Sequence, residues 1–388
     1  MVAAKDGSGA GCVKSGVVMQ LERLQIRDFR NIAQAGLHWS PGWNLLLGEN
    51  GQGKTNVLEA IGLLASGRSF RRATAQVMRR QGAAGFALQA EVVSGGLRHQ
   101  LLFTAQGTQQ QLQLNGKGVG SLSAMDQVVV AVVLTPDGPA LVRGAPEERR
   151  NYLDWIIFSH QRSYANLVRE YQTALRARNQ LLRSQCSDGR QYEAWEEQLV
   201  ALGAAIYQAR QEMMQQVARR MAHFLEALAL DPDGYGWQLA ATEGSGREAE
   251  ADQPREAYYR QALRYHRAAD QRSGSTSIGP HRDDPQFWQG KRLLARFASR
   301  GQQKRFLLAL KLTEADLLRE RLRAAPLLLL DDPLTELDQD GSSRLLRVLS
   351  MGSLQIFIAL CSTEGLAWPG ERPLRRFQVQ EGTIQPIA

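Results

Sequence analysis

An eight-residue motif, GENGQGKT at residues 48 to 55, constrains the fold of this 388-residue chain more than any other feature. It matches the pattern G-x-x-x-x-G-K-[ST] at every specified position. The apolar run WNLLL at 43 to 47 precedes it and predicts a buried strand. Apolar residues spaced three and four apart follow over 54 to 65 and predict a helix. Strand, glycine-rich turn and helix in this order indicate a phosphate-binding loop.

Each residue type in the motif suits a nucleotide phosphate. Glycines let backbone N–H groups curl around phosphate oxygens, and the start of the helix adds the positive end of its dipole. Lys54 can reach the β- and γ-phosphates, where it would act in catalysis, and Thr55 can ligate Mg²⁺. The expected nucleotide-binding residues are Gly48, Glu49, Asn50, Gly51, Gln52, Gly53, Lys54, Thr55 and Asn56.

A second motif, LLLLDDPLTELD at 327 to 338, supplies carboxylates. Its apolar residues predict a buried strand that ends at Asp331, so we expect Asp331 to join Thr55 in holding Mg²⁺. Asp332 would face the other way on an extended chain and could polarise an attacking water. Lys54 and Asp331 are 277 residues apart, which indicates an ATPase head whose two halves are separated by an insertion.

The pattern between these motifs changes from strand to helix and back. Strand-like segments cover 21 to 47 and 85 to 135, and helical spacing dominates 147 to 230. Two long helices joined at 183 to 191 could pair as an antiparallel hairpin. Strand and helix alternate again from residue 278. We therefore predict an α/β domain that is split by a helical insertion.

Composition narrows the functional classes. The net charge is +8, and only seven of the 47 basic residues are Lys. An excess of Arg suits a phosphate backbone, although high-GC codon usage would produce it too. Cys12, Cys186 and Cys361 have no metal-ligand spacing, which fits a reducing cytoplasm. No apolar run is long enough for a membrane helix, and residues 1 to 18 do not read as a secretory signal.

The segment FASRGQQKR at 297 to 305 has the form of a capped helix start. Phosphate loop, Ser-x-Gly-Gln turn, apolar-Asp-Asp strand and TELD stand in an order that resembles the ABC ATPases. In that family the turn binds the γ-phosphate of a nucleotide held by a second subunit. The resemblance implies this role for Ser299, Gly301 and Gln302, and a nucleotide contact for Asp338. Arg300 departs from the usual Gly.

Further segments resemble the RecF family of SMC-like ATPases. They are LQIRDFRNI at 24 to 32, GRSFR at 67 to 71, TPDGPALVRGAPEERRNYLD at 135 to 154 and GPHRDD at 279 to 284. With SRGQQKR and DDPLTELD, the similar stretches run in order from about residue 19 to residue 340.

This resemblance implies an α/β fold, an ABC-type P-loop ATPase head split by a short antiparallel helical hairpin. The expected divisions are a disordered extension at 1 to 18, the first half of the head at 19 to 146, a helical insertion at 147 to 270 and the second half of the head at 271 to 388. Residue 19 is a Met, so the chain in the cell could also start there.

The resemblance also implies a function. RecF-like proteins are cytoplasmic DNA repair and replication proteins that bind ATP with Mg²⁺ and dimerise head to tail upon it. They bind double-stranded DNA near single-strand gaps, including junctions of single and double strands, and help to load RecA with RecR and RecO. ATP hydrolysis is weak and resets the clamp. Alternatives are a P-loop small-molecule kinase, which leaves the Ser299 turn unexplained, and an ABC-type ATPase subunit without a DNA role.

Other residues have more than one interpretation. Arg68, Arg71 and Arg72 could contact DNA or nucleotide, or could lie in a solvated loop. Asn31 is a candidate for contact with the base. The segment at 358 to 364 lacks the His expected of a switch residue, and leaves Ser362 and Thr363 as candidates.

The GPHRDD segment reads as a structural joint. His281 and Arg282 are expected to orient a loop or an interface rather than to catalyse chemistry. Asp283 and Asp284 could form ion pairs with them.

Overall fold

The computed structural model describes residues 17–120, 125, 128–136, 139–184, 188–240, 254–370 and 372–387. Residues 1 to 16 of the extension expected at residues 1 to 18 lie outside the described residues. Its last two residues form strand β1 (Val17–Val18), which pairs in parallel with β13 (Ala324–Ala325). Cys12 and Cys186 lie outside the described residues. None of the described helices is long and apolar enough to cross a membrane.

The central sheet has six strands in the order β17-β16-β4-β15-β14-β9. All neighbouring pairs are parallel except β16 with β17. The strands are β4 (Trp43–Leu47), β9 (Ala131–Leu134), β14 (Leu327–Asp331), β15 (Ile356–Leu360), β16 (Leu374–Gln380) and β17 (Thr383–Ile387). Every residue of β4, β14 and β15 is buried, as their continuous apolar runs predicted.

Strand register sets the position of the two motifs. β15 lies between β4 and β14, and pairs Leu47 with Leu360 and Asp331 with Ala359. Because these strands are parallel, their carboxyl ends meet at one edge of the sheet. The phosphate loop, which follows Leu47, therefore lies at the same edge as Asp331.

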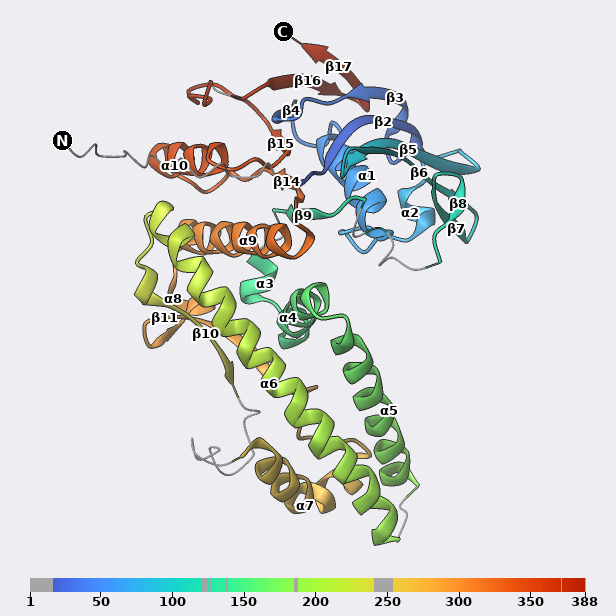
Figure 1. Cartoon of the computed structure of the whole chain (residues 1–388), viewed down its shortest axis with the longest axis vertical. Helices are drawn as coiled ribbons and strands as arrows, with labels where there is room; N and C mark the ends of the chain where they lie inside the picture. The colour runs from blue at the N-terminus through green and yellow to red at the C-terminus, as the bar shows by residue number, and fades with distance from the viewer. Residues whose placement is uncertain are drawn as a thin grey trace, which may run out of the picture.

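A second, antiparallel sheet has the strand order β3-β2-β5-β6-β7-β8. Its strands are β2 (Gln20–Phe29), β3 (Ile32–His38), β5 (Gly85–Ser94), β6 (Leu97–Gln106), β7 (Gln109–Leu114) and β8 (Lys117–Gly118). Helix α1 (Lys54–Ser66) shares one apolar core with both sheets, and the short helix α2 (Ala75–Met78) adds to it (Figure 1). This enclosure explains why α1 is apolar over most of its surface.

A helical arm projects from this head (Figure 1). It consists of α5 (Ser163–Arg183), the 39-residue α6 (Gly189–Ala227) and α7 (Arg255–Ser273), and it is joined to the head by α3 (Pro139–Arg143) and α4 (Pro146–His160). At 1.5 Å per residue, α6 is roughly 60 Å long, so it runs along the whole arm. Helix α5 ends at Arg183 and α6 begins at Gly189, and both positions lie in the segment expected to connect the two helices.

A buried ion cluster fixes the arm helices to one another. Arg178 of α5 is fully buried and donates to Glu196 of α6 (3.1 Å), to Asp270 of α7 (2.8 Å) and to Thr276 (2.8 Å). The hydrophobic stripes bring the helices together, and these polar contacts link all three helices at one point.

The chain returns to the head through a small antiparallel sheet. It contains β10 (Tyr235–Ala240), β11 (Asp284–Gln289) and β12 (Arg292–Leu293), and a 3-10 turn (Pro232–Gly234) precedes β10. Helix α8 (Leu294–Phe297) then leads into α9 (Arg300–Leu322), which shares the apolar core on the other face of the central sheet. Helix α10 (Gln339–Ser350) follows β14.

The GPHRDD segment joins arm and head, but not through the ion pairs expected from the sequence. Asp284 accepts two hydrogen bonds from Arg149 of α4, at 2.7 and 3.0 Å. Asp283 lies 4.0 Å from Arg210 of α6. His281 bonds instead to Tyr171 and to a backbone carbonyl. The expected pairing with His281 and Arg282 is wrong because β11 begins at Asp284 and packs against α4.

Candidate nucleotide-binding site

The phosphate loop depends on glycine at two crowded positions. Gly48 has φ 156°, and a Cβ there would lie 2.2 Å from the carbonyl oxygen of Val379. Gly53 has φ 118°, and a Cβ there would lie 2.8 Å from Asn31 Oδ1. Both the left-handed backbone and the close neighbours exclude a larger residue. The strand-to-helix turn therefore takes the curled form that the motif predicted.

The loop presents hydrogen-bond donors. Among the described residues, the backbone N–H groups of Gly51, Gln52 and Gly53 have no hydrogen-bond acceptor. The buried Lys54 ammonium donates to the carbonyl oxygens of Gly48 (2.6 Å) and Glu49 (2.9 Å), which hold it inside the loop. Free N–H groups, a lysine ammonium and the start of α1 form a donor set that fits a chain of phosphates.

Thr55 and Asp331 meet at the edge of the sheet. The Thr55 hydroxyl donates to Asp331 Oδ1 at 3.0 Å, although the residues are 276 positions apart. Burial raises the pKa of the Asp331 carboxyl to about 6, and the neighbouring Asp332 adds to this effect, whereas the Thr55 hydrogen bond and Lys54 oppose it. A hydroxyl and a carboxylate are ligands that Mg²⁺ accepts beside phosphate oxygens, so this pair fits the cation expected there.

Asp332 does not continue the extended strand as the sequence suggested. It has φ 46°, in the left-handed region, while its N–H still donates to Ala359 O. The expectation of an extended chain at this position is wrong, because the sheet pairing ends at Asp331. The backbone oxygen of Asp332 accepts a hydrogen bond from Lys304 of α9 at 3.2 Å. Its role toward an attacking water stays a prediction.

Asn31 lies on the phosphate loop. Its side-chain amide donates to Gln52 O at 2.9 Å, and its Oδ1 accepts from Asn56 at 2.8 Å. The hairpin between β2 and β3 is thereby fixed to both sides of Gly53. The contact with a base expected for Asn31 stays a prediction.

The basic segment after α1 surrounds a carboxylate that the sequence reasoning missed. Glu59 of α1 is fully buried and accepts two hydrogen bonds from Arg30 (2.7 and 2.8 Å) and one from Ser69 (2.5 Å). Arg71 lies 3.8 Å from Glu59 and donates to Asn56 at 3.3 Å. Glu59 is the one charged residue between Thr55 and Gly67, and a lone charge in such an apolar stretch was the available signal.

The other two arginines of this segment lie at the surface. Arg72 lies 3.7 Å from Glu148 of α4, and Arg68 is exposed. Of the three, only Arg71 contacts the phosphate-loop region, through Asn56. The DNA contacts expected for Arg68, Arg71 and Arg72 stay predictions.

The turn at Ser299, called the signature turn below, caps helix α9. Ser299 Oγ accepts from Gln302 N at 3.2 Å, and the Gln302 side chain accepts from Ser299 N at 2.9 Å. This reciprocal capping box leaves Ser299 and Arg300 exposed. Gly301 lies against Glu336, where a Cβ would be 3.1 Å from the carbonyl oxygen.

Two buried polar residues of α9 follow the signature turn directly. Gln303 is buried, donates to Leu294 O and Ala298 O, and accepts from Arg143 at 2.7 Å. Lys304 is also buried, and burial lowers the pKa of its ammonium. Neither residue was assigned a role from the sequence, since a polar pair after a helix cap gives no sign of burial.

Asp338 caps the next helix. Its carboxylate accepts from Gly341 N at 2.8 Å at the start of α10, and the residue is exposed. The nucleotide contact expected for Asp338 stays a prediction.

In the segment at 358 to 364, the Leu360 carbonyl oxygen accepts a hydrogen bond from Gly48 N, and Cys361 contacts the phosphate loop through its side chain. It follows β15, its thiol donates to Asn50 Oδ1 at 3.1 Å, and Lys54 Nζ lies 3.8 Å from its sulfur. The hydroxyl of Ser362 instead accepts from Glu364 N within its own turn. The side chain at the first position after the strand therefore reaches the loop, and the switch role expected for Ser362 or Thr363 stays a prediction.

The architecture defines the class of the protein. The sequence pattern of the RecF/RecN/SMC N-terminal domain family matches residues 20–385. The fold is similar to that of the Smc head domain from Pyrococcus furiosus, with a TM-score of 0.56 at 14% identity over 95% of this chain and 96% of that one. The chain is thus an ABC-type ATPase head of the SMC-like class.

More similar relatives define the family within this class. The chain is 43% identical to the DNA replication and repair protein RecF of Magnetococcus marinus, over 94% of this chain and 97% of the relative. It is 33% identical to the RecF of Geobacter sulfurreducens, over 95% and 100%. A solved structure of the recombination mediator protein RecF with ATP has a TM-score of 0.79 at 26% identity, over 96% and 100%. The chain belongs to the RecF family.

Proposed function

We propose that this chain is an ATP-switched DNA-binding protein of recombinational repair and replication-fork maintenance, with weak ATPase activity. The observation that carries the proposal is the 3.0 Å contact between Thr55 and Asp331. It joins the phosphate loop to the acidic strand end at one edge of the sheet, as a nucleotide with Mg²⁺ would need. ATP itself is supported by the RecF structure solved with ATP.

The roles proposed for the side chains follow from their positions. The phosphate loop, residues 48 to 56, would hold the phosphates, with Lys54 on the β- and γ-phosphates. Thr55 and Asp331 would hold Mg²⁺, which supplies charge neutralisation when bound. Asp332, next in the chain, would orient a water for slow hydrolysis.

The signature turn would act on a second subunit. Among the described residues, it bonds to no residue of the phosphate loop in its own chain, and Arg300 lies 3.6 Å from Glu336 after β14. Its exposed hydroxyl and the first two helical N–H groups, before the one that bonds to Ser299, are available to an outside anion. A head-to-tail dimer would bring Ser299, Gly301, Gln302 and Asp338 of one copy to the nucleotide of the other, so that ATP controls dimerisation.

The DNA role rests on the family. Curated relatives are named DNA replication and repair proteins, and a similar solved structure is described as part of the RecFOR pathway. We propose that the dimer clamps double-stranded DNA beside single-strand gaps in the cytoplasm, and that it works with RecR and RecO to load RecA. The net charge of +8 and its Arg-rich composition support a polyanionic partner.

Duplex DNA binding with ATP, with ADP and without nucleotide, measured together with molecular mass, tests this function. We expect higher mass and higher DNA affinity with ATP alone. Lys54→Ala should remove ATP binding itself. Ser299→Arg should retain ATP binding by the monomer and lose the dimer, since only the signature turn is altered.

The outcomes separate the alternatives. If DNA affinity and molecular mass did not change with ATP, the proposed switch would be overturned. If Ser299→Arg dimerised as well as the parent with ATP, the role across subunits would be wrong even if ATP and DNA both bind.

A further inference from the structure

We propose that a pocket beside the signature turn binds the nucleobase end of the nucleotide whose phosphates are held by a second copy of this chain. The inference rests on the ATP-dependent dimer proposed above and adds a base-recognition site to it. The pocket has a volume of about 520 Å³, which falls within the roughly 300–1,000 Å³ typical of small-molecule sites.

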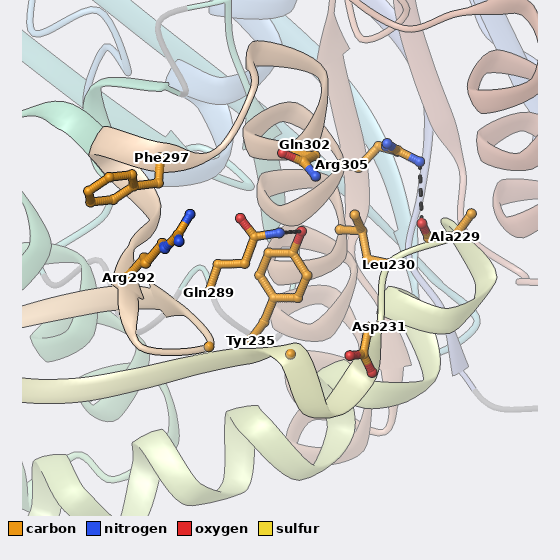
Figure 2. Close-up of a pocket in the computed structure, with 11 residues that line it drawn as sticks. Ala229, Leu230, Asp231, Tyr235, Gln289, Arg292, Phe297, Gln302 and Arg305 are labelled. Carbon is orange, nitrogen blue, oxygen red and sulfur yellow. Dashed lines mark hydrogen bonds between the residues drawn. The ribbon is translucent and has the colours of Figure 1, made fainter.

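The pocket lies where three segments meet (Figure 2). The first segment contributes Asp231 and Tyr235, which begins β10; the second contributes Gln289 at the end of β11 and Arg292 at the start of β12; the third contributes Phe297 at the end of α8 and Arg305 of α9. Gln302, whose side chain caps Ser299, also lines it. The pocket is therefore continuous with the turn expected to meet the γ-phosphate.

Phe297 and Arg292 form a stacking surface in this pocket. The Phe297 side chain is 60% exposed, only two residues before Ser299. The Arg292 guanidinium carbon lies 5.5 Å from the centre of its ring. The exposed ring beside the signature turn is free to stack on a ligand, and aromatic rings and guanidinium groups both stack on nucleobases.

Polar groups at the back of the pocket suit the edge of a base. Gln289 donates to the Tyr235 hydroxyl at 3.2 Å (Figure 2). Among the described residues, nothing donates to the amide oxygen of Gln289, which could accept from an exocyclic amine. Arg305 makes long hydrogen bonds to Ala229 O and Leu228 O, at 3.3 and 3.4 Å, and keeps further N–H groups for ring nitrogens. Stacking together with these donors and acceptors suits an adenine base.

Phe297→Ala tests the proposal in sedimentation velocity at saturating ATP, where the dimer dissociation constant reports contacts made across subunits. Stacking on an aromatic side chain contributes about 1–3 kcal/mol per base, and a symmetric dimer has two such sites. We therefore expect the dimer to weaken by at least about tenfold. ATP affinity of the dilute monomer should stay unchanged, since the phosphate loop holds that nucleotide.

CTP provides the discriminating comparison, because a pyrimidine offers a smaller ring for stacking. The parent should dimerise more weakly with saturating CTP than with ATP, and Phe297→Ala should reduce this difference. Phe297→Tyr should retain the parental behaviour. Tyr265→Ala, which removes an exposed aromatic residue of α7, serves as the matched control and should change neither value.

The outcomes are distinguishable from a failure of the proposed function. If the parent does not dimerise with ATP, the dimer itself is wrong. If the parent dimerises and Phe297→Ala matches it, the nucleobase site alone is overturned. Equal weakening with ATP and CTP would mean that Phe297 contacts protein, and an effect confined to DNA affinity would mean that the pocket serves DNA; both results refute the assignment.

Discussion

Asp331→Asn gives the sharpest test of the electrostatics at the nucleotide site. The Asp331 carboxyl is 2% exposed, and burial raises its pKa from 3.8 to about 6. The folded protein therefore binds this proton more tightly than the unfolded chain does. Stability falls as pH rises from about 4 to about 6 and then stays level, because above that range the carboxylate is ionised in both states.

The size of the effect follows from the shift in pKa. At 1.36 kcal/mol per pH unit, ionised Asp331 lowers the free energy of unfolding by about 3 kcal/mol at pH 8. The same linkage gives about 1.5 kcal/mol at pH 5, where the folded-state carboxyl is mostly protonated. Asn is neutral throughout and can still accept the Thr55 hydrogen bond. We therefore expect the free energy of unfolding of the variant to exceed that of the parent by about 3 kcal/mol at pH 8 and by about 1.5 kcal/mol at pH 5.

Urea unfolding without nucleotide or Mg²⁺, between pH 5 and pH 8, measures this difference. Asp340→Asn is the matched control: its carboxylate is exposed on α10, so the change should stay within about 0.5 kcal/mol at every pH. A gain for Asp331→Asn that is the same at pH 5 and pH 8 would refute the reasoning. The variant should also lose Mg²⁺-dependent ATP binding, since its amide no longer offers a charged ligand.

Three further substitutions test the packing around the site and the arm. Arg178→Met should lower the free energy of unfolding by about 3–5 kcal/mol in urea titrations, because it leaves buried Glu196 and Asp270 without their partner. Gln355→Leu should lower the free energy of unfolding by about 2–5 kcal/mol in the same titrations, because the Gln355 side chain bonds to the N–H and the carbonyl of Leu21. The Gly53→Ala protein should stay folded, because the strain is confined to a loop, and should bind ATP at least about tenfold more weakly in titration calorimetry. Unchanged affinity would contradict the inference that this position requires a glycine.

Several features were predictable because they depend on near neighbours. The strand at 43 to 47, the glycine turn and helix α1 follow from short apolar runs and one motif. The cap at Ser299 follows from Ser and Gln three residues apart. The antiparallel α5–α6 hairpin follows from helical spacing on both sides of a polar connection.

Other features required long-range pairing that local patterns do not encode. The left-handed turn at Asp332 depends on where the pairing of β14 with β15 ends. The partners of Asp283 and Asp284 depend on how α4 and α6 pack against β11, so their expected pairing with adjacent residues failed. Glu59 can be buried because Arg30 and Ser69, which belong to separate turns, donate hydrogen bonds to its carboxylate.

By itself, the sequence determined the chemistry available to this protein: a phosphate loop, an acidic strand end and a capped signature turn, each specified within a few consecutive residues. Tertiary structure alone decided which of these groups meet. Parallel register places Thr55 against Asp331 and Cys361 against the loop, and the return of the chain through β11 and β12 places Arg292 beside Phe297, two residues before Ser299. The physical reason is that side-chain chemistry is local, whereas contact between distant residues is determined by sheet register and helix packing.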